Sequence, residues 1–337
     1  MPEGDSSSVI DVLQEARRVV VTSHDRPDGD ALGAALALSR ILAARGTETH
    51  LAGCRPIPAR YEFLLRGEVF VPLNPAWCER GAALVALDCG GSDRAERLEA
   101  WDRSIAPLLN IDHHHSNTRF GDVDWVEPET SSASEMVLRL AEEAGWEVPI
   151  EAGEALWVGI VTDTGRFSYE NTSARTLRAA ARLVALGVRP APLADAVYRS
   201  RTLVEVRLVA RAMQSLEMGW AGQVAWVTLQ EKDFAEIGGG PEDASDLVNI
   251  PREIRGVRIG LFFYELPGRG ETKVSIRAAA PFEATALAAR FQGGGHRRAA
   301  GCAVAGPLEE AKAALFAALE EIWGGALQED REGGSRA

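Results

Sequence analysis

Carboxylate and imidazole side chains follow four short apolar segments in the first half of the chain, VVVTS, ALVAL, LLNI and WVGIVT. The polar residues after these segments are His24, Asp28 and Asp30, then Asp88, then Asp112, His113 and His114, and finally Asp163. Several carboxylates in one crevice would force protons onto some of them unless a cation balanced the charge. These residue types therefore favour a divalent metal centre.

The set of donor atoms narrows the choice of ion. Imidazole and carboxylate ligands without thiolates favour Mn2+, with Mg2+, Co2+ or Fe2+ as further candidates, and make zinc a weaker match. The ligands outnumber the usual protein share of one ion, which indicates two ions. The cysteines form no CxxC pair, so neither a disulfide framework nor a thiolate zinc site is indicated.

Each of these residues taken alone also has a simple structural explanation. Asp30 could cap the helix that follows it, and Asp28-Gly29 could form a turn. A single histidine after a strand is more often hydrogen-bonded than a ligand. The metal hypothesis rests on the whole set, because few structural requirements place such residues after four separate segments.

The elements that must position these residues alternate between strands and helices. Strands are expected at residues 19–22, 83–87, 108–111 and 157–161, and helices at 31–44, 133–144 and 174–186. Ser132 and Glu135 form a candidate capping box for the second helix. Such alternation predicts an α/β domain with a parallel sheet, in which ligands bind beyond the carboxyl ends of the strands.

The second half of the chain changes character after the GVRPAPLA segment. We expect a helix at residues 203–218, strands at 223–229, 258–265 and 272–278, and a closing helix at 309–323. The last two strands would form a hairpin through PGRGE. The predicted organisation is a catalytic domain at 1–188, a linker at 189–204, a smaller α/β substrate-binding domain at 205–325 and a disordered tail at 326–337. A cleft is expected between the domains.

The charge distribution restricts the partners. The chain of 337 residues has 36 Lys and Arg against 49 Asp and Glu, a formal net charge of -13. This balance argues against binding of long duplex nucleic acid. Residues 251–301 are locally basic, which fits a small phosphate-bearing ligand or, equally, solvated basic helix faces. The sequence contains neither a secretory signal nor a membrane-length apolar run, which predicts a cytoplasmic protein without membrane contact.

Five motifs carry a resemblance to a known family. SHDRPDGDALG, LDCG, IDHHHSN, TDTGRF and GGGHRRAAG occur in this order between residues 23 and 301. This pattern resembles the DHH phosphoesterase superfamily, and more narrowly its two-domain bacterial branch of nanoRNases and pAp phosphatases. The resemblance implies that His24 and Asp28 hold one metal, that Asp30, His113 and Asp163 hold the other, and that Asp88 bridges them.

The resemblance also implies roles beyond the metal ligands. His114 would face the phosphoryl group, and Asp112 would orient its neighbours, whereas His115 falls at a variable position and receives no role. Two ions that share an oxygen would activate water for in-line attack on phosphorus. The catalytic residues expected are therefore His114, Asp88 and Asp112.

The second domain is expected to bind the substrate. GGGHRRAAG could be a flexible linker, but the resemblance favours a phosphate cradle made by Gly293, Gly294 and Gly295, with His296 as a further donor. Arg277 alternates with apolar residues in its strand and can point away from the core, although an ion pair would explain it as well. Asn249 matches a stretch that the family places near the nucleotide.

The implied activity is hydrolysis of very short oligoribonucleotides from the 5′ end to 5′-mononucleotides, together with removal of the 3′-phosphate from 3′-phosphoadenosine 5′-phosphate (pAp). Hydrolysis of pApA or cyclic di-AMP is the nearest alternative, and a catalytically silent nucleotide sensor is the alternative from another class. The sequence does not favour a soluble inorganic pyrophosphatase, whose different second domain lacks the GGGH motif. It also does not favour a long-strand exonuclease of the RecJ type, which normally carries an additional nucleic-acid-binding domain. A homodimer is a further expectation.

Overall fold

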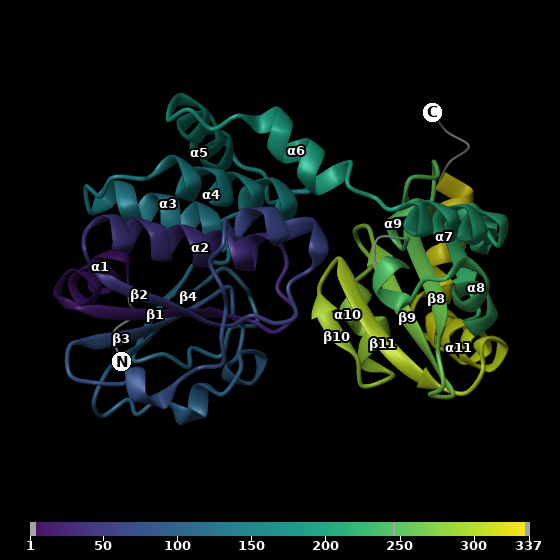
Figure 1. The fold of residues 1–337 in the computed structure, drawn as a ribbon. Coiled ribbons are helices and arrows are strands. Elements are labelled where there is room, and N and C mark those ends of the chain that lie inside the picture. The colour runs from purple at the N-terminus through teal and green to yellow at the C-terminus, as the bar shows by residue number, and fades with distance from the viewer. Residues whose placement is uncertain (1–4, 245–246, 334–337) are drawn as a thin grey trace. The chain divides into compact units, whose positions relative to one another are not determined.

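The computed structural model describes residues 5–244 and 247–333, and the chain divides into two compact units, Met1–Ser200 and Arg201–Ala337 (Figure 1). The first unit contains a five-stranded parallel sheet with strand order β2-β1-β3-β4-β5. Its strands are β1 (Arg18–Ser23), β2 (Glu48–Gly53), β3 (Ala82–Leu87), β4 (Leu108–Asp112) and β5 (Val123–Val126). The strand order reverses between β1 and β3, and in open α/β sheets such a switch point is where ligands bind.

Helices cover one face of this sheet (Figure 1). They are α1 (Ser6–Glu15), α2 (Gly29–Ala44), α3 (Ala133–Glu143) and α4 (Ile150–Asp163), followed in the chain by α5 (Ala174–Ala185) and α6 (Pro190–Tyr198). Alternate strand residues such as Val19 and Val85 join the core under the helices, whereas Val20 and Leu84 face a smaller cluster built around Leu98 and Trp101. Short 3-10 turns, η1 (Ala59–Leu64), η2 (Pro75–Trp77), η3 (Ser92–Arg94) and η4 (Leu98–Ala100), lie in the loops.

The strand predicted at residues 157–161 is wrong, because these residues belong to α4. α4 is buried on nearly every side, so its apolar run has no polar face and its periodicity does not distinguish a helix from a buried strand. It packs closely on α2, where a Cβ on Gly33 would lie 2.5 Å from the carbonyl oxygen of Ala155. Asp163 therefore approaches from the carboxyl end of a helix and not from a strand.

Two further segments differ from the prediction. Residues 190–198, expected in a linker, form α6, which begins with a proline at its first position and buries Leu193 and Val197 in the first core. Residues 326–333, expected in a disordered tail, continue the last helix, α11 (Leu308–Gly333), and residues 334–337 lie outside the described part.

The second unit is built on a six-stranded mixed sheet with strand order β10-β11-β9-β8-β7-β6. The strands are β6 (Glu217–Gly219), β7 (Val224–Leu229), β8 (Ile259–Leu266), β9 (Glu271–Ala278), β10 (Gly294–His296) and β11 (Ala299–Ala305). The helices are α7 (Leu203–Gln214), α8 (Glu231–Ile237), α9 (Asn249–Arg252), α10 (Ala284–Ala289) and α11, with turns η5 (Trp220–Gly222) and η6 (Pro241–Ala244). β8 and β9 form the expected antiparallel hairpin, and β7 pairs with β8 in parallel. Separate apolar clusters on the two faces complete this α/β unit.

Candidate metal centre

Ligand atoms from four parts of the first unit meet beyond the ends of β1, β3 and β4. His113 Nε2 lies 3.3 Å from Asp88 Oδ1, 3.6 Å from Asp163 Oδ2 and 3.8 Å from Asp30 Oδ2. His24 Nε2 lies 3.7 Å from Asp88 Oδ2, and Asp28 belongs to the same group of potential ligands. All six predicted metal ligands are therefore brought together.

His24 and His113 are each oriented by a hydrogen bond of the ring nitrogen Nδ1 to a backbone carbonyl oxygen. His24 Nδ1 lies 2.9 Å from the carbonyl oxygen of Asp25, and His113 Nδ1 lies 3.2 Å from that of Thr130. A carbonyl oxygen only accepts, so each Nδ1 must carry the proton and donate it. Nε2 of each ring therefore faces the carboxylates, and it offers a lone pair to a metal whenever the ring carries only the Nδ1 proton.

Two of the aspartates also cap helices. Asp28 Oδ1 accepts from the backbone N–H groups of Asp30 and Ala31 at the start of α2. Asp30 instead accepts from Ala133 N at 2.6 Å and Ser134 N at 2.9 Å, so it caps α3 and not α2. The expectation that Asp30 caps the helix following it is therefore wrong, because Asp28 is the cap of α2. Backbone N–H groups nevertheless fix both carboxylates within the cluster.

Asp88 lies at the centre of the cluster, with a buried side chain and an unusual backbone conformation. Its backbone has a φ of 56°, in the left-handed region that non-glycine residues rarely adopt, and its side chain is 3% exposed. Among the described residues Asp88 Oδ1 has no hydrogen-bond partner, although His113 Nε2 lies 3.3 Å away. A buried carboxylate oxygen without a donor fits a cation ligand.

The electrostatics of the cluster also fit a cation. Burial, reinforced by Asp88 and Asp163, raises the pKa of Asp30 well above its usual value. Burial likewise raises the pKa of Asp163 to about 7, against the opposing effect of His113. Burial would raise the pKa of Asp88 too, but the nearby histidines outweigh it and hold that pKa below its usual value. The carboxylates compete for protons, and divalent cations would remove that competition.

His114 and Asp112 form a separate buried pair. His114 Nδ1 lies 2.6 Å from Asp112 Oδ1 and 3.5 Å from Asp88 Oδ1. Burial lowers the pKa of His114, but the bond to Asp112 and the charge of Asp88 outweigh burial and raise this pKa. Asn117 Nδ2 donates to Asp112 Oδ2 at 2.6 Å and to the carbonyl oxygen of Cys89 at 3.0 Å. Sequence reasoning missed Asn117, although it ends the IDHHHSN motif, whereas His115 is exposed.

The predicted substrate-binding residues lie in the second unit. Arg277 is half-buried on the face of β9 opposite Val274 and Ile276, and its Nε donates to Asn249 Oδ1 at 3.2 Å. These two predicted residues therefore contact each other. Several of the other basic residues between 251 and 301 have structural partners, because Arg290 and Arg297 pair with glutamates and Arg298 donates to a carbonyl oxygen.

The glycine run is ordered and is not a linker. Gly294, Gly295 and His296 form β10, the edge strand that pairs with β11. A Cβ on Gly293 would lie 2.3 Å from the carbonyl oxygen of Gly301, so close packing on β11 requires this glycine. Gly294 has open space around its Cα hydrogens. The side chain of His296 lies outside the described structure.

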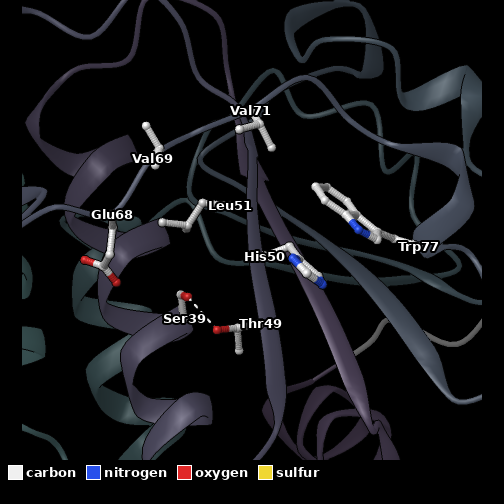
Figure 2. Close-up of a pocket in the computed structure, with 8 residues that line it drawn as sticks. All are labelled: Ser39, Thr49, His50, Leu51, Glu68, Val69, Val71 and Trp77. Carbon is white, nitrogen blue, oxygen red and sulfur yellow. Dashed lines mark hydrogen bonds between the residues drawn. The ribbon is translucent and has the colours of Figure 1, made fainter.

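A hollow in the first unit is lined by none of these side chains. It has a volume of about 410 Å³ and lies beside the edge strand β2 (Figure 2). His50 stacks on Trp77 there with ring centroids 4.2 Å apart, and Ser39 donates to Thr49. This hollow is therefore separate from the candidate metal centre.

Comparison with known proteins decides the family. Residues 18–160 match the model of the DHH family, N-terminal domain, and residues 223–324 match the DHHA1 domain. The chain is 32% identical over 310 residues to the bifunctional oligoribonuclease and PAP phosphatase NrnA of Thermus thermophilus, an alignment that covers 90% of this chain and 89% of that protein. The chain belongs to the NrnA family. NrnA of Bacillus subtilis is 30% identical over 290 residues, which cover 85% of this chain and 89% of that protein.

Solved structures show the same fold. An exopolyphosphatase-related protein from Bacteroides fragilis superposes with a TM-score of 0.90 at 24% identity, covering 96% of this chain and 97% of that chain. RecJ of Thermus thermophilus in complex with Mn2+ gives a TM-score of 0.56 at 19% identity, covering 96% of this chain and 55% of that chain. The predicted two-unit α/β fold of the NrnA family is confirmed. Among the described residues, no helix has the length and apolar character needed to cross a membrane.

Proposed function

We propose that this NrnA-family hydrolase degrades very short oligoribonucleotides from the 5′ end to 5′-mononucleotides and removes the 3′-phosphate from pAp. The observation that carries the proposal is the convergence of His24, Asp28, Asp30, His113 and Asp163 on the buried carboxylate of Asp88. The names of the relatives from Thermus thermophilus and Bacillus subtilis support the substrate class.

The residues fit two divalent ions. His24 and Asp28 would hold one, Asp30, His113 and Asp163 would hold the other, and Asp88 would be shared between them. We propose Mn2+, with Mg2+ or Co2+ as substitutes, which the ligand types support. RecJ, which shares the fold, was solved with Mn2+ and with Mg2+. When bound, the ions would supply an activated water and neutralise charge on the phosphoryl group.

His114 is the proposed general acid. Its Nδ1 proton is held by Asp112, which Asn117 holds in turn, so the ring has one fixed orientation. The raised pKa of His114 favours its protonated form, whose Nε2 proton is then available for transfer. In the hydrolysis the oxygen of water bonds to phosphorus as the water loses one proton to solvent, the bond to the leaving oxygen breaks, and His114 donates a proton to that oxygen. His114 then regains a proton from solvent.

Substrate binding is proposed for the second unit. Arg277, with Asn249 beside it, would contact a phosphate, and the backbone of Gly293, Gly294 and Gly295 with His296 would cradle another. The net charge of -13 supports short substrates over long duplexes. A cytoplasmic location and a homodimer stay predictions.

Linear and cyclic dinucleotides are the second candidate substrates. The cyclic-di-AMP phosphodiesterase GdpP of Geobacillus thermodenitrificans is 26% identical over 314 residues, but the match covers only 45% of that protein. One Mn2+-loaded preparation should be assayed on pAp, pApA, cyclic di-AMP and a short RNA. Faster turnover of short RNA and pAp supports the proposal. Turnover confined to cyclic di-AMP, or absent on all four, contradicts it.

A further inference from the structure

Three of the proposed ligands are anchored to one short segment, residues 130–134. The carbonyl oxygen of Thr130 accepts from His113 Nδ1 at 3.2 Å, and the N–H groups of Ala133 and Ser134 donate to Asp30 at 2.6 and 2.9 Å. Asn171 completes the set through its Nδ2. It donates to the carbonyl oxygens of Ser131, at 3.0 Å, and Asp163, at 3.2 Å. We call residues 130–134 the anchor segment.

A buried carboxylate holds the anchor segment in turn. Glu135 is 3% exposed, and its Oε2 accepts from the hydroxyls of Ser131, at 2.5 Å, and Thr176, at 2.9 Å. Its Oε1 accepts from Arg175 Nε at 2.6 Å, while Arg175 Nη2 donates to Thr130 Oγ1 at 2.7 Å. A charge this deeply buried is costly unless it is fully hydrogen-bonded, so this network has one favoured arrangement.

Among the hydrogen bonds of the described residues, none ties His24 or Asp28 to the anchor segment. His24 Nδ1 is paired with the carbonyl oxygen of its neighbour Asp25, and Asp28 Oδ1 accepts from the first turn of α2. The anchoring is therefore asymmetric. It acts on the ligands of one proposed ion and leaves the group of His24 and Asp28 to local contacts.

We propose that Asn171 and Glu135 are positioning residues that set the affinity of the ion at Asp30, His113 and Asp163, independently of the ion at His24 and Asp28. This inference rests on the two-ion centre of the proposed function. Neither residue belongs to the groups of potential ligands. Both act by fixing the backbone that orients the ligands. Changes around a ligand of this kind weaken metal affinity by about 10- to 100-fold.

The test is Mn2+ binding by Asn171→Leu, which keeps the size of the side chain and removes both hydrogen-bond donors. Wild type should bind two ions. The variant should retain one at unchanged affinity and bind the second about 10- to 100-fold more weakly, as measured by calorimetry. In the electron paramagnetic resonance spectrum, the coupled signal of a Mn2+ pair should give way to that of an isolated ion. Asn74→Leu, the same change at an exposed asparagine, is the control and should match wild type.

Glu135→Gln is the second variant, because it keeps the shape while it removes the charge and replaces one accepting oxygen by an NH2 donor. It should shift the same ion in the same direction, whereas Glu143→Gln on the exposed side of α3 should have no effect. Thermal unfolding of the metal-free variants identifies any misfolded protein. Equal weakening of both ions, or unchanged binding in folded Asn171→Leu and Glu135→Gln, would overturn the inference. Wild type with fewer than two ions would instead overturn the two-ion centre itself.

Discussion

Asp88 is the residue on which the centre depends. Its carboxylate is buried, its backbone is held at an unusual φ, and it belongs to two of the three groups of potential ligands. We expect Asp88→Asn to abolish both hydrolysis and tight Mn2+ binding, because the amide is a poor ligand and cannot neutralise two cations. The measurement is Mn2+ calorimetry alongside turnover of pAp. Asp93→Asn, an exposed neighbour, is the matched control, and undiminished turnover in Asp88→Asn would contradict the assignment.

The titration of Asp163 predicts how pH acts on the metal-free protein. Its pKa is raised to about 7 by burial, so the favourable protonated form is lost as the pH rises through 7. Burial also raises the pKa of Asp30, and the effect of its titration on stability has the same sign. The free energy of unfolding without metal should therefore be lower at pH 8 than at pH 6. Denaturant unfolding in a chelator measures this, and saturating Mn2+ should remove the difference. A metal-free protein more stable at pH 8 would contradict the prediction.

At the scale of elements, the close approach of α4 to the anchor segment is the sharpest constraint. A Cβ on Gly159 would lie 1.9 Å from Ser134 Oγ and 2.8 Å from Asp30 Oδ1. Gly159→Ala should therefore cost about 1–3 kcal/mol of stability through overpacking and weaken Mn2+ binding. Gly325→Ala is the control, because that helical glycine has open space and the change should be neutral or stabilising. Denaturant unfolding measures the stability of both variants. Equal free energies of unfolding for Gly159→Ala and Gly325→Ala would show that Gly159 is not tightly packed against Ser134 and Asp30.

The sequence predicts most elements of the first unit within a few residues. β1, β3 and β4 are short, β-branched or aliphatic runs, and α2, α3 and α5 have clear starts and stops. α4 was mistaken for a strand because burial on all sides removes the polar face that marks a helix. β2, with the polar start Glu-Thr-His, and the three-residue β10 were not predicted, because edge strands of this kind have little apolar pattern.

At the scale of the whole molecule, the sequence predicts which side chains lie together at the proposed metal centre. It predicts less well which hydrogen bonds position those side chains. The six proposed metal ligands lie close together, even though Asp163 comes from a helix. The hydrogen bonds of Asn117, Asn171 and Glu135 were missed. They join residues up to 41 positions apart through backbone carbonyls and hydroxyls that have no sequence pattern. The basic charge of residues 251–301 likewise overestimates how many side chains are available to bind a ligand, because several of these arginines pair with other residues of the fold.

The division of work between the two units gives a further prediction. Arg277→Ala should raise the KM for pAp by about tenfold or more, because a charge-assisted hydrogen bond contributes roughly 1.5–3 kcal/mol. Mn2+ stoichiometry should remain that of wild type, because none of the proposed ligands lies in the second unit. Steady-state kinetics with metal analysis measures both. Arg269→Ala, in the turn between β8 and β9, is the control. Loss of metal in Arg277→Ala would show that the roles of the units are misassigned.

The central claim is that six side chains distant in sequence bind a pair of adjacent divalent ions. Anomalous diffraction from crystals grown with Mn2+ tests it most directly. We predict two manganese peaks, one against His24 and Asp28 and one against Asp30, His113 and Asp163, with Asp88 in contact with both. A map without manganese at these side chains, at saturating concentration, would contradict the account.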